Sequence, residues 1–166
     1  MDDRALVARQ LGRPPRAFRR VVVRCPWGLP AVTEQAPYDE RGGPFPTTYY
    51  LTCPHLVAAV SRLEAAGGVD RWSAAAAADA TLAESLARGH EDQRRIRLEL
   101  AGEARGADGG ASLALGIAGA QRVGSLKCLH AHVAFALVRP QYELGRRILS
   151  ELEPLWPERC CTDALS

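Results

Sequence analysis

The chain divides near residue 54 into two parts with different local preferences, and this division is the strongest constraint on its fold. The first part holds the β-branched run AFRRVVVRC (17–25) and then a proline-rich segment over 25–54, which favours short strands joined by turns. After Pro54 the sequence is rich in alanine and other helix-favouring residues. Because strands do not alternate with helices, the pattern argues against a parallel, doubly wound sheet.

The expected fold class is therefore α+β, with a small antiparallel sheet in the N-terminal third and four or five helices covering it. Strands are expected over 17–25, 31–34 and 47–52. A short helix capped by Asp2 or Asp3 should precede them, and Gly12 should end it. The later helices are expected over 54–66, 73–104, 125–138 and 142–154, with a bend or break at Gly89 in the second and Ser125 as the cap of the third.

The length of 166 residues predicts one domain over 1–166, with an N-terminal arm or helix at 1–16 and an extended tail at 154–166. No apolar run approaches the roughly 20 residues that a membrane span requires. The N-terminus carries acids where a signal peptide carries basic residues, so we expect a cytoplasmic protein. Its five cysteines are then thiols, metal ligands or redox groups rather than disulfides.

Arginine supplies 20 of the 21 basic residues, and seven arginines lie between Arg4 and Arg24. This basic segment would suit an acidic partner, although a solvated charged surface is the simpler interpretation. Aromatic residues do not interleave with these arginines, which argues against nucleic acid as the partner.

The stretch KCLHAH (127–132) places one cysteine and two histidines within a predicted helix. Cys128 and His132 are four residues apart and share a helix face, whereas His130 lies about 160° from Cys128 around the axis. We therefore expect His132 to point toward a cysteine-centred site and His130 to belong to the core. Cys53 precedes Pro54, so it should cap a helix whose N-terminal partial charge favours a thiolate.

Three segments of the chain, RCPWGLPAV, GGPFPTTYYLTCPHLVAAVSRLEAAGG and GIAGAQRVGSLKCLHAHVA, closely resemble an actinobacterial family known as domain of unknown function 501. The resemblance covers the three signature blocks in order and spacing. It implies no activity, but it implies that Cys25, Cys53, Cys128 and His132 belong to the family's pattern. It also implies genes near those of enolase, a division-septum protein and an exopolyphosphatase.

The preferred hypothesis is a metal or redox site. Cys25, Cys53 and Cys128 should converge with His132, or with Cys160 as an alternative fourth ligand. Such a set would hold either zinc or an iron–sulfur cluster, in a structural metal protein or a redox sensor.

Two alternatives remain open at this point. The first is an enzyme in which Cys53 is a thiolate nucleophile and His132 or His55 is its base. The second is a non-enzymatic adaptor, linked to cell division or polyphosphate metabolism, whose arginine-rich segment binds an acidic partner. The sequence identifies no substrate for either.

Overall fold

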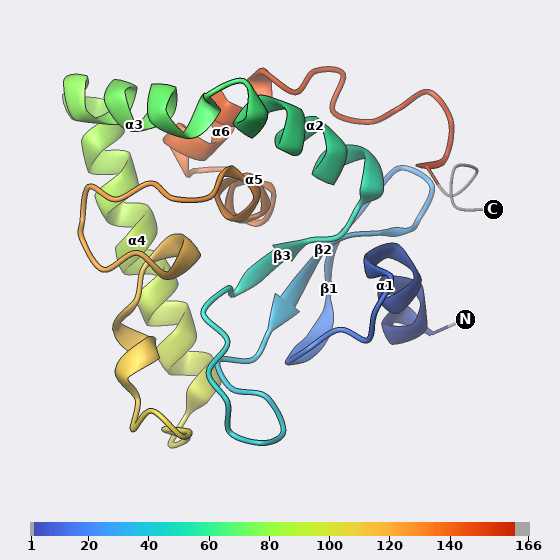
Figure 1. Cartoon of the computed structure of the whole chain (residues 1–166), viewed down its shortest axis with the longest axis vertical. Helices are drawn as coiled ribbons and strands as arrows, with labels where there is room; N and C mark the ends of the chain where they lie inside the picture. The colour runs from blue at the N-terminus through green and yellow to red at the C-terminus, as the bar shows by residue number, and fades with distance from the viewer. Residues whose placement is uncertain (1, 162–166) are drawn as a thin grey trace.

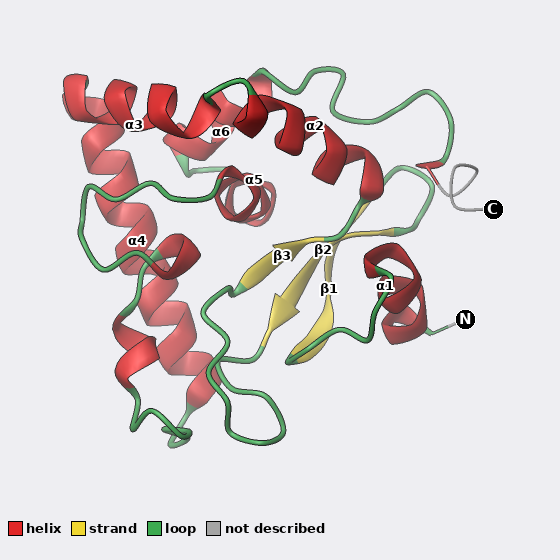
Figure 2. Cartoon of the chain, in the orientation of Figure 1, coloured by secondary structure: helices red, strands yellow, loops and turns green. Residues whose placement is uncertain are grey.

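A computed structural model of the protein describes residues 2–161 and shows a three-stranded antiparallel sheet with helices packed around it (Figures 1 and 2). The strands are β1 (Phe18–Arg24), β2 (Pro30–Gln35) and β3 (Tyr49–Leu51), in the order β1-β2-β3. Val32 at the centre of the sheet pairs with Val23 on one side and Leu51 on the other. The predicted α+β class and the antiparallel sheet are confirmed.

Among residues 2–161, one α-helix precedes the sheet and five follow it. They are α1 (Asp3–Leu11), α2 (Pro54–Ala65), α3 (Gly68–Ala78), α4 (Ala80–Ala101), α5 (Leu129–Val138) and α6 (Glu143–Ser150). Two short 3-10 turns, η1 (Ala111–Ala114) and η2 (Ile117–Gly119), lie in the connection between α4 and α5. None of the helices within residues 2–161 is long and apolar enough to cross a membrane.

Helix α5 is the centre of the molecule, where it contacts β3, α2 and α6 (Figure 1). Its side chains are buried around almost the whole circumference, including Leu129, His132, Val133 and Phe135. A helix that is apolar on all sides is typical of a protein interior. The spacing of the residues predicts His132 and His130 on opposite sides of this helix, and other parts of the protein pack against both sides.

The helical region predicted over 73–104 divides at Asp79 rather than at Gly89. The Asp79 carboxylate accepts a hydrogen bond from the Leu82 N–H at 3.1 Å and so caps the start of α4. Gly89 lies in the middle of α4, where a Cβ atom would approach Cε2 of Tyr142 to 2.7 Å. The glycine is needed for close packing of a ring, and the helix continues through it.

Helix α5 begins at Leu129, four residues after the predicted start, and Cys128 rather than Ser125 is its N-cap. The Cys128 side chain makes no capping hydrogen bond. Instead, Oε1 of Glu64 in α2 accepts the Leu129 N–H at 2.7 Å. A carboxylate from another helix therefore caps α5, which explains why local sequence misplaced its start.

Residues 154 to 160 contain no α-helix or strand. Residue 1 and residues 162–166, which belong to the predicted arm and tail, lie outside the described part.

Candidate metal site

Three side chains that commonly bind metals meet where α2 ends and α5 begins. Glu64 lies in the last turn of α2, Cys128 directly precedes α5, and His130 lies in the first turn of α5. Nδ1 of His130 is 3.9 Å from Sγ of Cys128 and 3.3 Å from Oε1 of Glu64. One donor atom from each residue lies within 4.8 Å of the other two. We call these three residues the Glu–Cys–His group.

Helix α2 holds both nitrogens of the His130 ring. Ser61, which lies one helical turn before Glu64, places its Oγ 3.2 Å from Nε2, while Glu64 faces Nδ1. Oε1 of Glu64 is itself held by the Leu129 N–H. Hydrogen bonds with Ser61 and with the Leu129 N–H therefore set the orientation of the histidine and the carboxylate. In known metal sites, residues that hydrogen-bond to the ligands orient them in the same way.

The distances from Nδ1 of His130 to its two partners fit one small cation. Zinc bonds of about 2.0 to 2.3 Å in tetrahedral geometry separate the ligand atoms by roughly 3.3 to 3.6 Å. The observed 3.3 Å between nitrogen and oxygen lies in this range, and the 3.9 Å between nitrogen and sulfur is slightly longer. The side chains of His130 and Glu64 are 26% and 28% exposed, so an ion can reach them from solvent.

The electrostatic environment of the group favours positive charge. The pKa of His130 is raised, first by its hydrogen bond with Cys128 and further by the nearby charge of Glu64, against an opposing effect of burial. These partners favour the charged form of the imidazole. A metal cation in place of the proton would meet the same carboxylate and the same sulfur.

Cys128 and His130 also line a cavity of about 400 Å³. This volume is within the usual range for pockets that bind small molecules. Its other walls are mainly apolar and include Leu11, Tyr49, Tyr50, Leu51, Val57 and Ala131. An ion held by the group would therefore lie at the wall of an apolar cavity.

The structure does not bring the predicted ligands Cys25, Cys53, Cys128 and His132 together. Within residues 2–161, the Glu–Cys–His group is the set of three or more such donors that lie close enough to share an ion. Of the four predicted ligands, it contains Cys128 alone. Cys25 and Cys53 are buried elsewhere, Cys25 in the turn that follows β1 and Cys53 at the N-terminus of α2.

The positions of the two histidines of KCLHAH are the reverse of those expected: His130 lies beside Cys128, and His132 lies in the core. His132 is fully buried, with Nδ1 2.8 Å from the Tyr142 hydroxyl and its ring 6.2 Å from that of His90. Burial, with a smaller effect of His90, lowers the pKa of His132 to about 3, so this side chain is neutral in the core. The prediction assumed a helix through Cys128, but the helix begins one residue later, and the face that Cys128 and His132 would share does not exist.

A second group of thiols lies where the tail passes the start of α2. Sγ of Cys53 is 4.0 Å from Sγ of Cys161. Burial raises the pKa of Cys161 to about 11, with further contributions from Cys53, Cys160 and Cys25. Of the predicted candidates, Cys53 therefore contacts Cys161, a residue that the sequence had not singled out, and Cys160 precedes it in the chain.

His55, the alternative base predicted for Cys53, is half-buried in the first turn of α2. It lines a different cavity, together with Arg62 and Pro154. Glu64 and Ser61 were not predicted as site residues, and His130 was assigned to the core. No local pattern connects Glu64 with Cys128, because the two are separated by most of the helical region.

These features define an α+β protein with a mixed carboxylate, thiol and imidazole group between two helices. The chain matches the family described as Protein of unknown function (DUF501) over residues 21–150, and it belongs to this family. No curated protein and no solved structure matches it significantly. The matched span includes the whole Glu–Cys–His group, whereas Cys160, Cys161 and helix α1 lie outside it.

Proposed function

We propose that this protein binds a divalent transition metal, with zinc as the preferred ion, through Glu64, Cys128 and His130. The combination of thiolate, imidazole and carboxylate is typical of zinc sites. Magnesium and calcium prefer sites made of oxygen ligands alone. The convergence of three different donors at a distance suited to one ion is the observation that carries the proposal.

Three protein ligands are typical of zinc sites that react, whereas structural zinc sites usually have four. A fourth position would remain for water or for a molecule in the apolar cavity that Cys128 and His130 line. Zinc in such a site lowers the pKa of a bound water and polarises a bound carbonyl or phosphoryl oxygen. The protein's own contribution is to hold the His130 ring through Ser61 and the Glu64 carboxylate through the Leu129 N–H.

At the Glu–Cys–His group, zinc is favoured over an iron–sulfur cluster, because a cluster requires four soft ligands around one centre and this group supplies one thiol. Cys25 and Cys53 lie with Cys161, whereas Cys128 lies with a carboxylate and an imidazole. The cysteines of this chain therefore form two groups.

A cysteine enzyme is the competing function, with Cys128 as its nucleophile and His130 as its base. In such enzymes the group that orients the histidine binds the ring nitrogen remote from the thiol. Here the remote nitrogen, Nε2, is held by the Ser61 hydroxyl, whereas the Glu64 carboxylate faces Nδ1 together with Cys128, as two ligands of one ion would. For the predicted Cys53 nucleophile, the neighbouring group is the Cys161 thiol.

Zinc content and affinity test the proposal. Purified protein should be analysed for metal and titrated with zinc against a chromophoric chelator. Glu64→Gln, Cys128→Ser and His130→Ala should each weaken zinc binding by at least tenfold, because each removes one of three ligands. The glutamine retains an oxygen that can accept the Leu129 N–H, so this variant separates ligation from capping.

Cys53→Ser and His55→Ala are matched controls on the same helix, and both should retain zinc. Equal zinc affinity in wild type and Cys128→Ser would refute the proposal. A wild type without zinc affinity, whose Cys128 alkylates rapidly and only when His130 is present, would establish the cysteine enzyme instead.

A further inference from the structure

Six of the seven arginines between Arg4 and Arg24 fall into two sets. Four of its arginines pair with carboxylates: Arg16 with Asp39, Arg19 and Arg20 with Glu34, and Arg24 with Asp3. These pairs link β1 to β2 and to α1, and link the segment before β1 to the loop after β2; three carboxylates thus offset part of the basic charge of the segment. Arg4 and Arg13 have no ion pair with any carboxylate in the described part of the chain, and both line one cavity.

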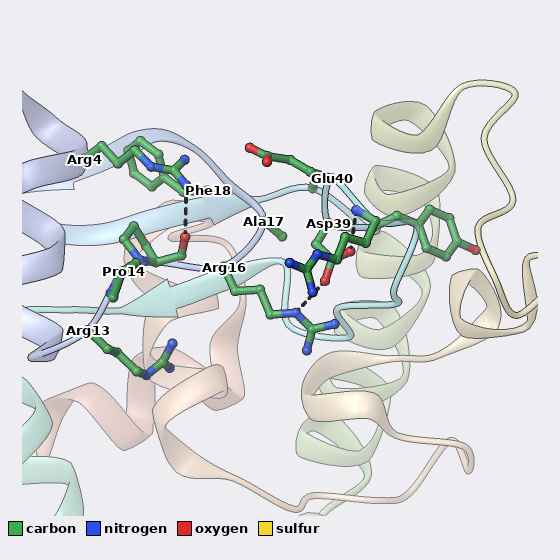
Figure 3. A pocket seen from close by; sticks show the side chains of 12 residues that line it. Arg4, Arg13, Pro14, Arg16, Ala17, Phe18, Asp39 and Glu40 are labelled. Atoms are coloured by element: carbon green, nitrogen blue, oxygen red, sulfur yellow. Dashed lines mark hydrogen bonds and ion pairs between the residues drawn. The ribbon is translucent and has the colours of Figure 1, made fainter.

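This cavity, which we call the arginine cavity, has a volume of about 580 Å³ and lies between the segment that follows α1 and the loop that follows β2 (Figure 3). Arg41 enters its lining from the second loop, also without a carboxylate partner among residues 2–161. Arg4 makes a hydrogen bond of 3.5 Å to the Pro15 carbonyl, and Arg13 makes one of 3.5 Å to the Tyr50 hydroxyl. Bonds of this length leave most of the guanidinium donors available.

The charge of the lining is positive even after its acidic residues are counted. Four arginines and two acids line the cavity, which gives a formal charge of +4 − 2 = +2. Asp39 is occupied by Arg16 and by the backbone N–H groups of Arg41 and Gly43, at 3.0 and 2.8 Å. Asp39 therefore fixes the loop that carries Arg41, and the three remaining guanidiniums face the single carboxylate of Glu40.

One part of the cavity wall is apolar. Pro14, Pro15, Ala17 and Phe18 contribute to it. Ala17 has a φ of 55°, a left-handed conformation that costs energy for a residue with a Cβ atom. Its neighbours in the chain, Arg16 and Phe18, both line the cavity. A cavity of this volume fits a small molecule rather than the surface of a macromolecule.

We propose that the arginine cavity binds a small molecule that carries a diphosphate or triphosphate group. Guanidinium groups donate paired hydrogen bonds to phosphate oxygens, and the excess charge of the lining matches a multiply charged anion. The apolar wall would contact the remainder of the molecule. The arginine cavity shares no lining residue with the cavity beside the Glu–Cys–His group, so this proposal is independent of metal binding.

Isothermal titration calorimetry with inorganic pyrophosphate and with ADP tests the proposal, in buffer containing EDTA so that no bound metal captures the phosphate. Arg13→Ala and Arg41→Ala should each weaken binding of both ligands by roughly tenfold or more, since each removes charge-assisted hydrogen bonds. Arg88→Ala and Arg122→Ala are matched controls, because both arginines are exposed and lie outside this cavity. The controls should bind within about twofold of wild type, since they lose only distant, screened charge.

Affinity for ADP above that for pyrophosphate is expected if the apolar wall contacts the ligand. Equal weakening in all four variants would show only general attraction between charges and would overturn the proposal. A hexaglutamate peptide that binds at the same arginines while pyrophosphate and ADP do not would also overturn it, and would identify an acidic protein segment as the partner. Melting curves of the four variants should match that of wild type, because these side chains are exposed.

Discussion

Replacing Gly89 with alanine should destabilise the protein, although alanine favours helices and Gly89 lies within α4. At an unhindered helix position this change would add about 1 kcal/mol of stability. At Gly89, however, the new Cβ would lie 2.7 Å from Cε2 of Tyr142 and 3.1 Å from Cδ1 of Ile117. The sign of the effect therefore depends on whether the tyrosine ring can move.

The ring of Tyr142 has little freedom to move. It lies edge-on to Phe135 with 5.4 Å between ring centroids, and its hydroxyl is 2.8 Å from Nδ1 of His132. Inserting a methyl group into such a packed region costs about 1 to 3 kcal/mol. We take a value of roughly 2 to 3 kcal/mol from this range, which leaves a net loss of about 1 to 2 kcal/mol after the helical gain.

Urea unfolding followed by circular dichroism would measure this loss, and the melting temperature should fall by about 3 to 6 °C for a chain of this size. Ala83→Gly, at an exposed position of the same helix, measures the helical preference by itself and should cost about 1 kcal/mol. In a Tyr142→Leu background, Gly89→Ala should destabilise less, because the nearest atom that the new Cβ approaches is absent. A Gly89→Ala protein more stable than wild type would refute the reasoning.

Two further predictions concern titration and oxidation. Burial lowers the pKa of His90, and its Nδ1 accepts the Ile117 N–H. The unfolded chain therefore takes up this proton more readily, and the free energy of unfolding should fall as the pH decreases below the pKa of an unfolded histidine, about 6.5. The slope for this group is up to about 1.4 kcal/mol per pH unit. His90→Gln should give a shallower fall in urea unfolding between pH 5 and 7, and curves parallel to wild type would contradict this. Because the sulfurs of Cys53 and Cys161 are 4.0 Å apart, diamide should join them in a disulfide as it is itself reduced to a hydrazine. Peptide mass spectrometry should detect this bridge in wild type and in Cys160→Ser but not in Cys161→Ser, and a bridge that persists in Cys161→Ser would show that the observed pair is not the reactive one.

The sequence by itself determined the class of fold and the start of α2. The β-branched run and the prolines restrict residues before 54 to strands and turns, and the alanine-rich remainder forms helices. Pro54 as the first residue of α2, with Cys53 as its N-cap, follows from the fixed φ of proline and its missing N–H. These features depend on neighbours in the chain, so local sequence is sufficient to predict them.

The candidate metal site was decided by tertiary structure. His130 could be recognised as a partner of Cys128 only once α5 was known to begin at Leu129, and that start depends on a carboxylate from α2. Periodicity arguments assume a helix that is already in place, and they carry no information about a cap supplied by a distant residue.

The arginines illustrate the same limit on the surface. The sequence shows seven arginines between Arg4 and Arg24 but does not show which of them are neutralised. Arg20 lies opposite Glu34 only because β1 and β2 pair in that register. Arg13 remains without a carboxylate partner in the described residues, at the edge of a cavity that two separate loops enclose. Composition gives the number of charges, but whether two charges pair depends on the distance between them. Only the folded chain sets that distance.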